Sequence, residues 1–80
     1  PTLTQVSPSS VSPLVPVSLL VSGTNLSTVS LASFAGEEVV PTDITPTSFR
    51  IDVTPENFAS AQVLATLANG ETGLSPVVPI

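Results

Sequence analysis

Six carboxylates are the only side chains of this 80-residue chain that could carry acid–base chemistry near neutral pH. They are Glu37, Glu38, Asp43, Asp52, Glu56 and Glu71. The sequence has no His, Cys, Lys or Tyr, so the usual general bases and activated nucleophiles are missing. A hydrolase built on two carboxylates would need a cleft that holds them face to face, and so small a domain has little room for one. We therefore expect no enzymatic activity.

The same residue types make a poor metal site. Transition metals prefer imidazole or thiolate ligands, and the chain contains neither. Calcium could use Glu37, Glu38 or Asp43 with backbone carbonyls, but no D-x-D spacing or acidic loop gathers enough ligands. We expect no metal and no cofactor, and we interpret the acids as solvated surface groups.

The charge balance also excludes several partners. Arg50 is the only basic residue and the net charge is −5, so the chain cannot neutralise a row of phosphates in nucleic acid or on an anionic membrane. No apolar run approaches the roughly 20 residues that a membrane span requires, and no signal-type start is present. Trp and Tyr are absent, which removes the flat aromatic surfaces that sugars usually stack on. Phe34, Phe49 and Phe58 are assigned to the core or, for Phe58, to capping a turn.

The chain reads as one domain, residues 1–80, made of short strands. Apolar residues alternate with polar ones at three places, which is the period of a half-buried strand: Val17, Leu19 and Val21; Phe49, Ile51 and Val53; Val63, Ala65 and Leu67. Weaker runs cover Thr2 to Val6, Val29 to Phe34, Glu37 to Val40 and Thr72 to Val78. A short helix is the competing reading of Ala61 to Ala68, but the Asn69-Gly70 turn signal favours a hairpin.

Prolines indicate where these strands lie. Those near the two ends of the chain predict that the first and last strands are edges or are bulged, because proline cannot donate to a central ladder. Pro41, Pro46 and Pro55 fall between apolar runs and are assigned to turns. About seven short strands, spaced roughly ten residues apart and without helices, predict an all-β, immunoglobulin-like β-sandwich that has no disulfide.

Five short motifs follow one another along nearly the whole chain: Leu3, Val6, Pro8 and Ser9; Gly23, Asn25 and Leu26; Phe34, Ala35 and Gly36; Ser48, Phe49, Ile51, Val53 and Pro55; and Asn69 with Gly70. This succession resembles the IPT/TIG family of immunoglobulin-like domains. Val11 departs from the glycine that is usual there, and Pro13 and Pro16 follow it. The resemblance implies a fold and not a particular activity.

The segment Gly23-Thr24-Asn25 predicts a chain reversal at the end of the sandwich. Gly23 can adopt a positive φ, Asn25 can bond to nearby backbone amides, and Leu26 is expected to plug the end of the core. The alternative reading is that Asn25-Leu26-Ser27 is an N-glycosylation sequon in an exposed loop.

The run Val29 to Phe34 contains a conflict in its alternation. Val29 and Leu31 share one face of an unbroken strand, and Phe34 falls on the other. A bulge near Ala32 or Ser33 would return Phe34 to the core. Without a bulge, either Phe34 or Leu31 faces solvent or a partner.

Protein binding through apolar packing or strand addition is the remaining kind of function. Four apolar residues are candidate interface residues, because they lie outside the alternating strands or on the strand face opposite to the one predicted to be buried: Leu14, Val15, Leu20 and Leu64. The alternative is that they are ordinary surface residues, with Leu14 packed beneath the first crossover. Thr24, Asn25, Asn69 and Gly70 are candidate loop contacts.

Two functional hypotheses follow, both without catalysis. Starting at Pro1, the chain is expected to be a complete small gene product; by analogy with immunoglobulin-like domains on tailed phages it would be a decoration protein on the virion surface, bound to capsid or tail. The alternative is a spacer or adhesion module of a larger extracellular or cell-surface protein, which would contact neighbouring domains or a host ligand. A homo-oligomer or an array is compatible with either.

Overall fold

The computed structural model describes residues 1–56 and 60–80, and all regular structure in these ranges is β-strand. One sheet contains, in spatial order, β1 (Thr2–Ser7), β2 (Val17–Thr24), β6 (Ser48–Val53) and β5 (Thr42–Thr45). The other contains β4 (Glu37–Val39), β3 (Val29–Phe34), β8 (Val63–Leu67) and β9 (Thr72–Leu74). A short separate pair joins β7 (Ser60–Ala61) to β10 (Val78–Pro79). No helix in the described ranges is long and apolar enough to cross a membrane.

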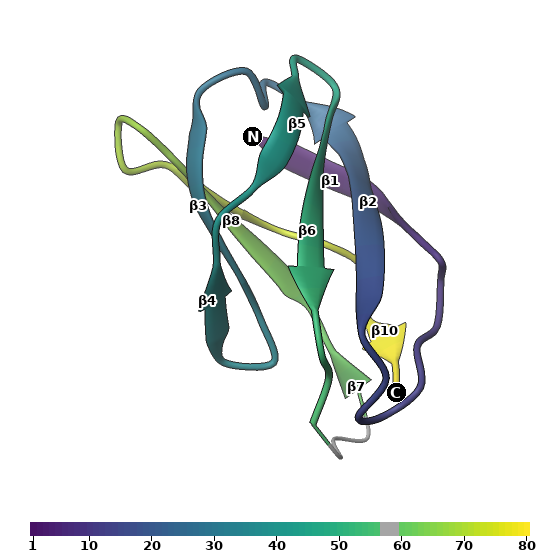
Figure 1. Cartoon of the computed structure of the whole chain (residues 1–80). Helices are drawn as coiled ribbons and strands as arrows, with labels where there is room; N and C mark the ends of the chain where they lie inside the picture. Colours follow the sequence, from purple (N-terminus) through teal and green to yellow (C-terminus); the bar gives the residue numbers. More distant parts are fainter. Residues whose placement is uncertain (57–59) are drawn as a thin grey trace.

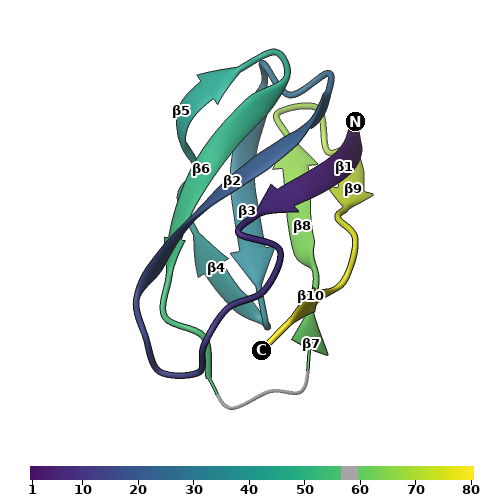
Figure 2. The ribbon, with the colours of Figure 1, turned by 90° about the vertical axis from the view of Figure 1, so that its right-hand side faces the viewer.

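The strand order identifies the architecture. β1, β2, β6 and β5 take the places of strands A, B, E and D of an immunoglobulin sandwich, while β3, β8 and β9 take those of C, F and G. The two sheets face one another and all pairings are antiparallel (Figure 1 and Figure 2). The predicted immunoglobulin-like β-sandwich is confirmed, and so is the strand, rather than helix, reading of Ala61 to Ala68.

The apolar residues that alternation predicted to face inward form the core between the sheets. Leu19 and Val21 of β2 are fully buried, as are Phe49 and Ile51 of β6. β8 contributes Val63, Ala65 and Leu67 to the same cluster. Val17 is half-buried against this core, and Leu26 is fully buried at the end of it, as expected. Phe58 lies outside the described residues.

A bulge in β3 resolves the conflict over Phe34, but it lies earlier than expected. The register between β3 and β8 shifts between Val29 and Leu31, and not near Ala32 or Ser33. The extra residue lets Val29, Ala32 and Phe34 all face the core, where each is buried. Leu31 is then left half-buried on the outer side.

The strands differ from the sequence prediction in several places. β5 fills the segment between Pro41 and Pro46, where no strand was predicted; it is an edge strand whose four residues are all exposed, so it shows no apolar alternation. The run Thr72 to Val78 is interrupted after Leu74 and resumes as β10. β1 and β9 are edge strands, and the register of β1 shifts between Leu3 and Gln5, as the terminal prolines predicted.

Ser75 occupies the interruption between β9 and β10. Its side chain is 2% exposed, and its hydroxyl oxygen accepts a 2.8 Å hydrogen bond from the backbone amide of Val63. The same hydroxyl donates to the carbonyl of Pro76 at 2.8 Å. The side chain therefore replaces a backbone acceptor at a point where the strand is broken.

We expect Ser75→Ala to lower the free energy of unfolding by about 1–3 kcal/mol, because it leaves the buried Val63 amide without an acceptor. Ser30→Ala is a matched control, since the exposed Ser30 hydroxyl makes a 3.2 Å bond to the Thr66 carbonyl, and it should change stability by less than about 0.5 kcal/mol. Urea unfolding followed by circular dichroism measures both. Equal effects would contradict the role given to Ser75.

Gly23 has a different purpose from the one predicted. It lies within β2, opposite Leu3 of β1, and does not have a positive φ; in this segment Asn25 does, with φ 57°. A Cβ at position 23 would collide with the backbone carbonyl of Thr2. Gly23 is thus required for the close approach of β1. The Asn69-Gly70 turn, in contrast, forms as predicted, with Gly70 at φ 91°.

The two termini lie at opposite ends of the sandwich, which measures 32 × 19 × 18 Å (Figure 1). The N-terminus lies at the end that carries the β2–β3, β5–β6 and β8–β9 connections. We call this end the loop end. The C-terminus lies at the other end, together with the β1–β2 crossover, and we call this the crossover end (Figure 2).

Candidate interaction surfaces

The four predicted loop contacts come together at the loop end. Thr24 is the last residue of β2 and Asn25 follows it in the β2–β3 connection, while Asn69 and Gly70 belong to the β8–β9 turn; all four are exposed. The amide of Ala68 donates a 2.9 Å hydrogen bond to the carbonyl of Thr28, which joins the two connections. They are far apart in the sequence, so only the folded sandwich makes them neighbours.

A third connection, between β5 and β6, completes this end and was not anticipated. The amide of Gly23 donates to the carbonyl of Thr47 at 2.8 Å, and the amide of Leu26 to the carbonyl of Pro46 at 3.0 Å. Thr45 braces the turn itself, because its hydroxyl accepts from the amide of Ser48 at 3.0 Å. The loop end is therefore a surface of three connections tied together through backbone hydrogen bonds.

The chemistry of the loop end is polar. The side-chain oxygen of Asn69 accepts a 3.0 Å hydrogen bond from the backbone amide of Glu71, so this oxygen stabilises the turn itself. Asn25 contributes its positive φ to the reversal, and its side chain stays exposed at the surface. None of the large apolar side chains that the structure exposes lies in these three connections. The surface offers hydroxyl and amide groups and the carboxylate of Glu71, but its three connections contain no large exposed apolar side chain.

Leu14 and Val15 project from the crossover end. They are 72% and 52% exposed, which overturns the alternative that Leu14 packs beneath the crossover. Leu14 has φ 61°, and its amide donates a 2.7 Å hydrogen bond to the carbonyl of Pro55. This bond and the left-handed backbone hold the leucine in place while its side chain remains in solvent.

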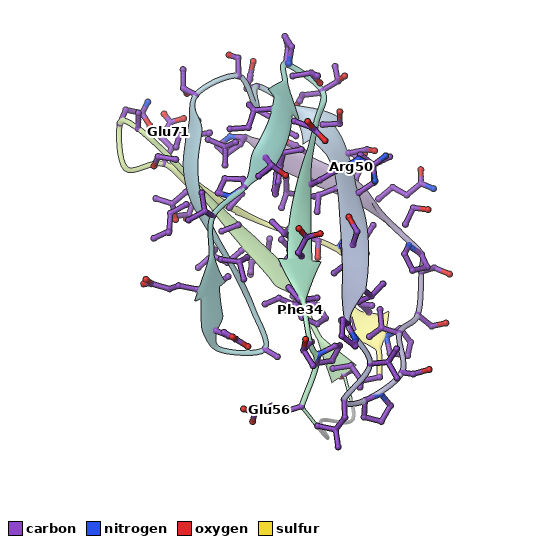
Figure 3. The ribbon with its side chains drawn as sticks, in the orientation of Figure 1. Phe34, Arg50, Glu56 and Glu71 are labelled. Atoms are coloured by element: carbon purple, nitrogen blue, oxygen red, sulfur yellow. The ribbon has the colours of Figure 1, made fainter. Side chains whose placement is uncertain are left out.

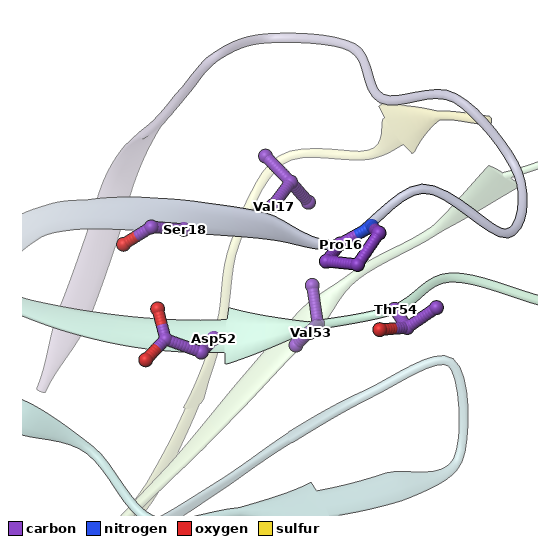
Figure 4. A pocket seen from close by; sticks show the side chains of 6 residues that line it. All are labelled: Pro16, Val17, Ser18, Asp52, Val53 and Thr54. Atoms are coloured by element: carbon purple, nitrogen blue, oxygen red, sulfur yellow. The ribbon is translucent and has the colours of Figure 1, made fainter.

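A shallow hollow of about 300 Å³ lies beside this projection (Figure 4). Pro16, Val17 and Ser18 line it from the start of β2, and Asp52, Val53 and Thr54 from the end of β6. Ser18 and Asp52 are directly opposed across the two strands. The hollow combines apolar walls with one carboxylate and two hydroxyls.

Leu20 and Leu64 face outward on different sheets and are only half-buried. Leu20 of β2 lies between Ser7 of β1 and Arg50 of β6. Leu64 of β8 is opposite Leu74 of β9, which is 56% exposed and which the sequence interpretation missed. Alternation could not identify Leu74 as an outward residue, because the strand ends there and the pattern does not continue through Thr72 to Val78. The four candidate interface residues therefore lie on three separate surfaces.

The carboxylates do not converge. Glu56 and Glu71 lie at opposite ends of the molecule, and Arg50 lies on the side of the first sheet (Figure 3). The Nε atom of Arg50 is 3.7 Å from Oδ2 of Asp43. Both side chains are exposed, so this ion pair contributes little to stability. Within residues 1–56 and 60–80, no three acidic side chains gather closely enough to hold a metal ion.

The comparisons with known proteins bear on the fold. No protein-family model matches the chain, and no curated protein matches it. A similar solved structure is that of the Bacteroides ovatus protein SGBP-B of a mixed-linkage glucan utilization locus, in complex with a mixed-linkage heptasaccharide. The TM-score is 0.76 at 14% sequence identity, which supports the sandwich fold. The match covers 98% of this chain but only 22% of the SGBP-B chain.

Proposed function

We propose that this chain is a non-catalytic, IPT/TIG-like spacer module of a larger extracellular or cell-surface protein. The observation that carries the proposal is the placement of the termini at opposite ends of a 32 Å sandwich. A module of this shape, joined at both ends, holds its neighbours apart along one axis. The similarity to 22% of the longer SGBP-B chain supports a modular context.

The side chains of the described residues favour a spacer over a sugar-binding module. Phe34 and Phe49 are buried in the core, with exposed fractions of 2% and 0%. The chain has no Trp or Tyr. The hollow beside β2 and β6 has hydroxyls and a carboxylate but no aromatic wall. The glycan named with SGBP-B therefore has no evident stacking surface in the described part of this chain.

The virion hypothesis gains no support from the comparisons, since the similar structure belongs to a glucan utilization locus. An adhesion role for the loop end is the second candidate. The observation that favours it is the convergence of Thr24, Asn25 and Asn69 on one end of the sandwich. Its polar surface would suit hydrogen bonding to a hydrated ligand.

The intact mass of the native polypeptide from its natural source tests the proposal. We expect a mass well above the 8.1 kDa of residues 1–80. A mass of 8.1 kDa in a large particle would contradict the spacer function and favour decoration. Titration of the folded chain with mixed-linkage glucan oligosaccharide, followed by amide chemical shifts, should give no localised change. Shifts around Asp52 or Asn69 would instead indicate sugar binding there.

A further inference from the structure

The crossover end and the loop end differ in chemistry. The crossover end presents Leu14 and Val15, 72% and 52% exposed, whereas the three connections of the loop end contain no exposed large apolar side chain. Leu14 is held in a left-handed conformation by its bond to Pro55. A leucine whose backbone is hydrogen-bonded to a neighbouring segment and whose side chain lies mostly in water is suited to insertion into a partner.

The C-terminal strand leaves the sandwich at the same end. The amide of Val11 donates a 3.0 Å hydrogen bond to the carbonyl of Pro79, which ties the crossover to the last strand. Ile80 is half-buried against the core. A segment continuing from Ile80 would therefore start at the end of the sandwich that carries the β1–β2 crossover (Figure 2).

The charges near this end are of one sign. Asp52 lines the hollow, and Glu56 projects from the same end (Figure 3). The single basic side chain of the protein, Arg50, pairs with Asp43. A complementary surface would offer an apolar recess for Leu14 and Val15 and a basic side chain for the hollow.

The size of the end face favours a tethered partner over a free one. The sandwich is 19 × 18 Å across, so an end-on contact would bury on the order of 300 Å² on each side, which matches the lower limit of interfaces between domains of one chain, about 600 Å² in total. Separate proteins that associate stably bury about 1,200 Å² or more. A partner joined covalently needs less area because its effective concentration is high.

From these observations we propose that the crossover end is an interdomain interface, at which Leu14, Val15 and the hollow around Asp52 dock the module that follows Ile80 in the same polypeptide. The docking fixes the angle between the two modules. This inference rests on the proposed spacer function, and it adds that the spacer is rigidly joined on its C-terminal side. The docked surface of the partner is apolar with at least one basic side chain.

The test uses the full polypeptide that carries residues 1–80. The residual dipolar couplings of this module and of the one after it should fit a single alignment tensor, which would show that the two modules are rigidly joined. We expect Leu14→Ser with Val15→Ser to abolish the common alignment, and Asp52→Asn to weaken it, while both modules stay folded. Leu74→Ser is the matched control, because Leu74 is 56% exposed but lies on a sheet face away from the interface; it should leave the alignment unchanged.

The outcomes separate this inference from the proposed function. A native mass of 8.1 kDa would remove both. A larger mass with a common alignment that survives Leu14→Ser and Val15→Ser would leave the spacer function standing and overturn the interface. Independent alignment in the wild-type polypeptide, or a chain that ends near Ile80, would also overturn it. Loss of alignment in the Leu74→Ser control would place the interface on the other sheet.

Discussion

Replacing Phe49 by alanine is expected to lower the free energy of unfolding by about 3–5 kcal/mol. Phe49 is fully buried in the central strand pair of the first sheet, opposite Val21 of β2. Truncation removes its apolar contacts and leaves a cavity that the two sheets can close only partly. A domain of this size has a total stability of about 4–12 kcal/mol, so the loss is a large part of it.

Urea unfolding followed by far-ultraviolet circular dichroism is the suitable measurement, because the chain has no Trp or Tyr for fluorescence. Leu74→Ala is the control, and as an exposed cross-strand contact to Leu64 it should cost about 0.2–1 kcal/mol. Phe49→Leu should fall between the two variants, which keeps the test informative if Phe49→Ala does not fold. Similar losses at Phe49 and Leu74 would show that the core is not where the structure places it.

Replacing Gly23 by alanine is expected to lower the free energy of unfolding by about 1–3 kcal/mol, because the added methyl group overpacks the site. The added methyl group would collide with the Thr2 carbonyl, which is backbone and cannot rotate away as a side chain could. β1 must therefore move away from β2 near Thr2 and Leu3. Because β1 is an edge strand, we expect it to loosen locally before the whole sandwich unfolds.

Amide hydrogen exchange measured residue by residue distinguishes this local effect from a general loss of stability. In Gly23→Ala, exchange in β1 should accelerate more than exchange in β8. Gly36→Ala is the control: its Cβ would meet no atom within 4 Å, but its φ of 81° makes alanine strained. That variant should lose stability without selective exchange in β1. Wild-type exchange of β1 amides in Gly23→Ala would rule out the close approach.

Much of the sandwich could be predicted from local patterns. The alternation in Val17 to Val21, Phe49 to Val53 and Val63 to Leu67 is strong because each strand has one face in the core. β5 could not be found in this way, since an exposed edge strand has no buried face to select apolar residues. The position of the β3 bulge also depended on its pairing with β8, which no residue of β3 specifies alone.

The candidate surfaces were less predictable than the fold. Leu14, Val15, Leu20 and Leu64 are outward residues as expected, but they occupy three separate surfaces. Leu74 was missed because its strand is interrupted at Ser75, whose buried hydroxyl replaces a backbone acceptor. The role of Gly23 was misjudged because a positive φ and a close approach both require glycine, and the sequence does not distinguish them.

The sequence by itself determined that this protein is an all-β sandwich whose side chains offer few groups for acid–base chemistry or for binding phosphates. Residue type and period two carry that information locally, since they depend on the chemistry of single side chains and on one strand at a time. Tertiary structure alone decided which residues share a surface. The hydrogen bonds from Ala68 to Thr28 and from Val11 to Pro79 join segments far apart in the chain, and such contacts exist only once the chain has folded and brought these segments side by side.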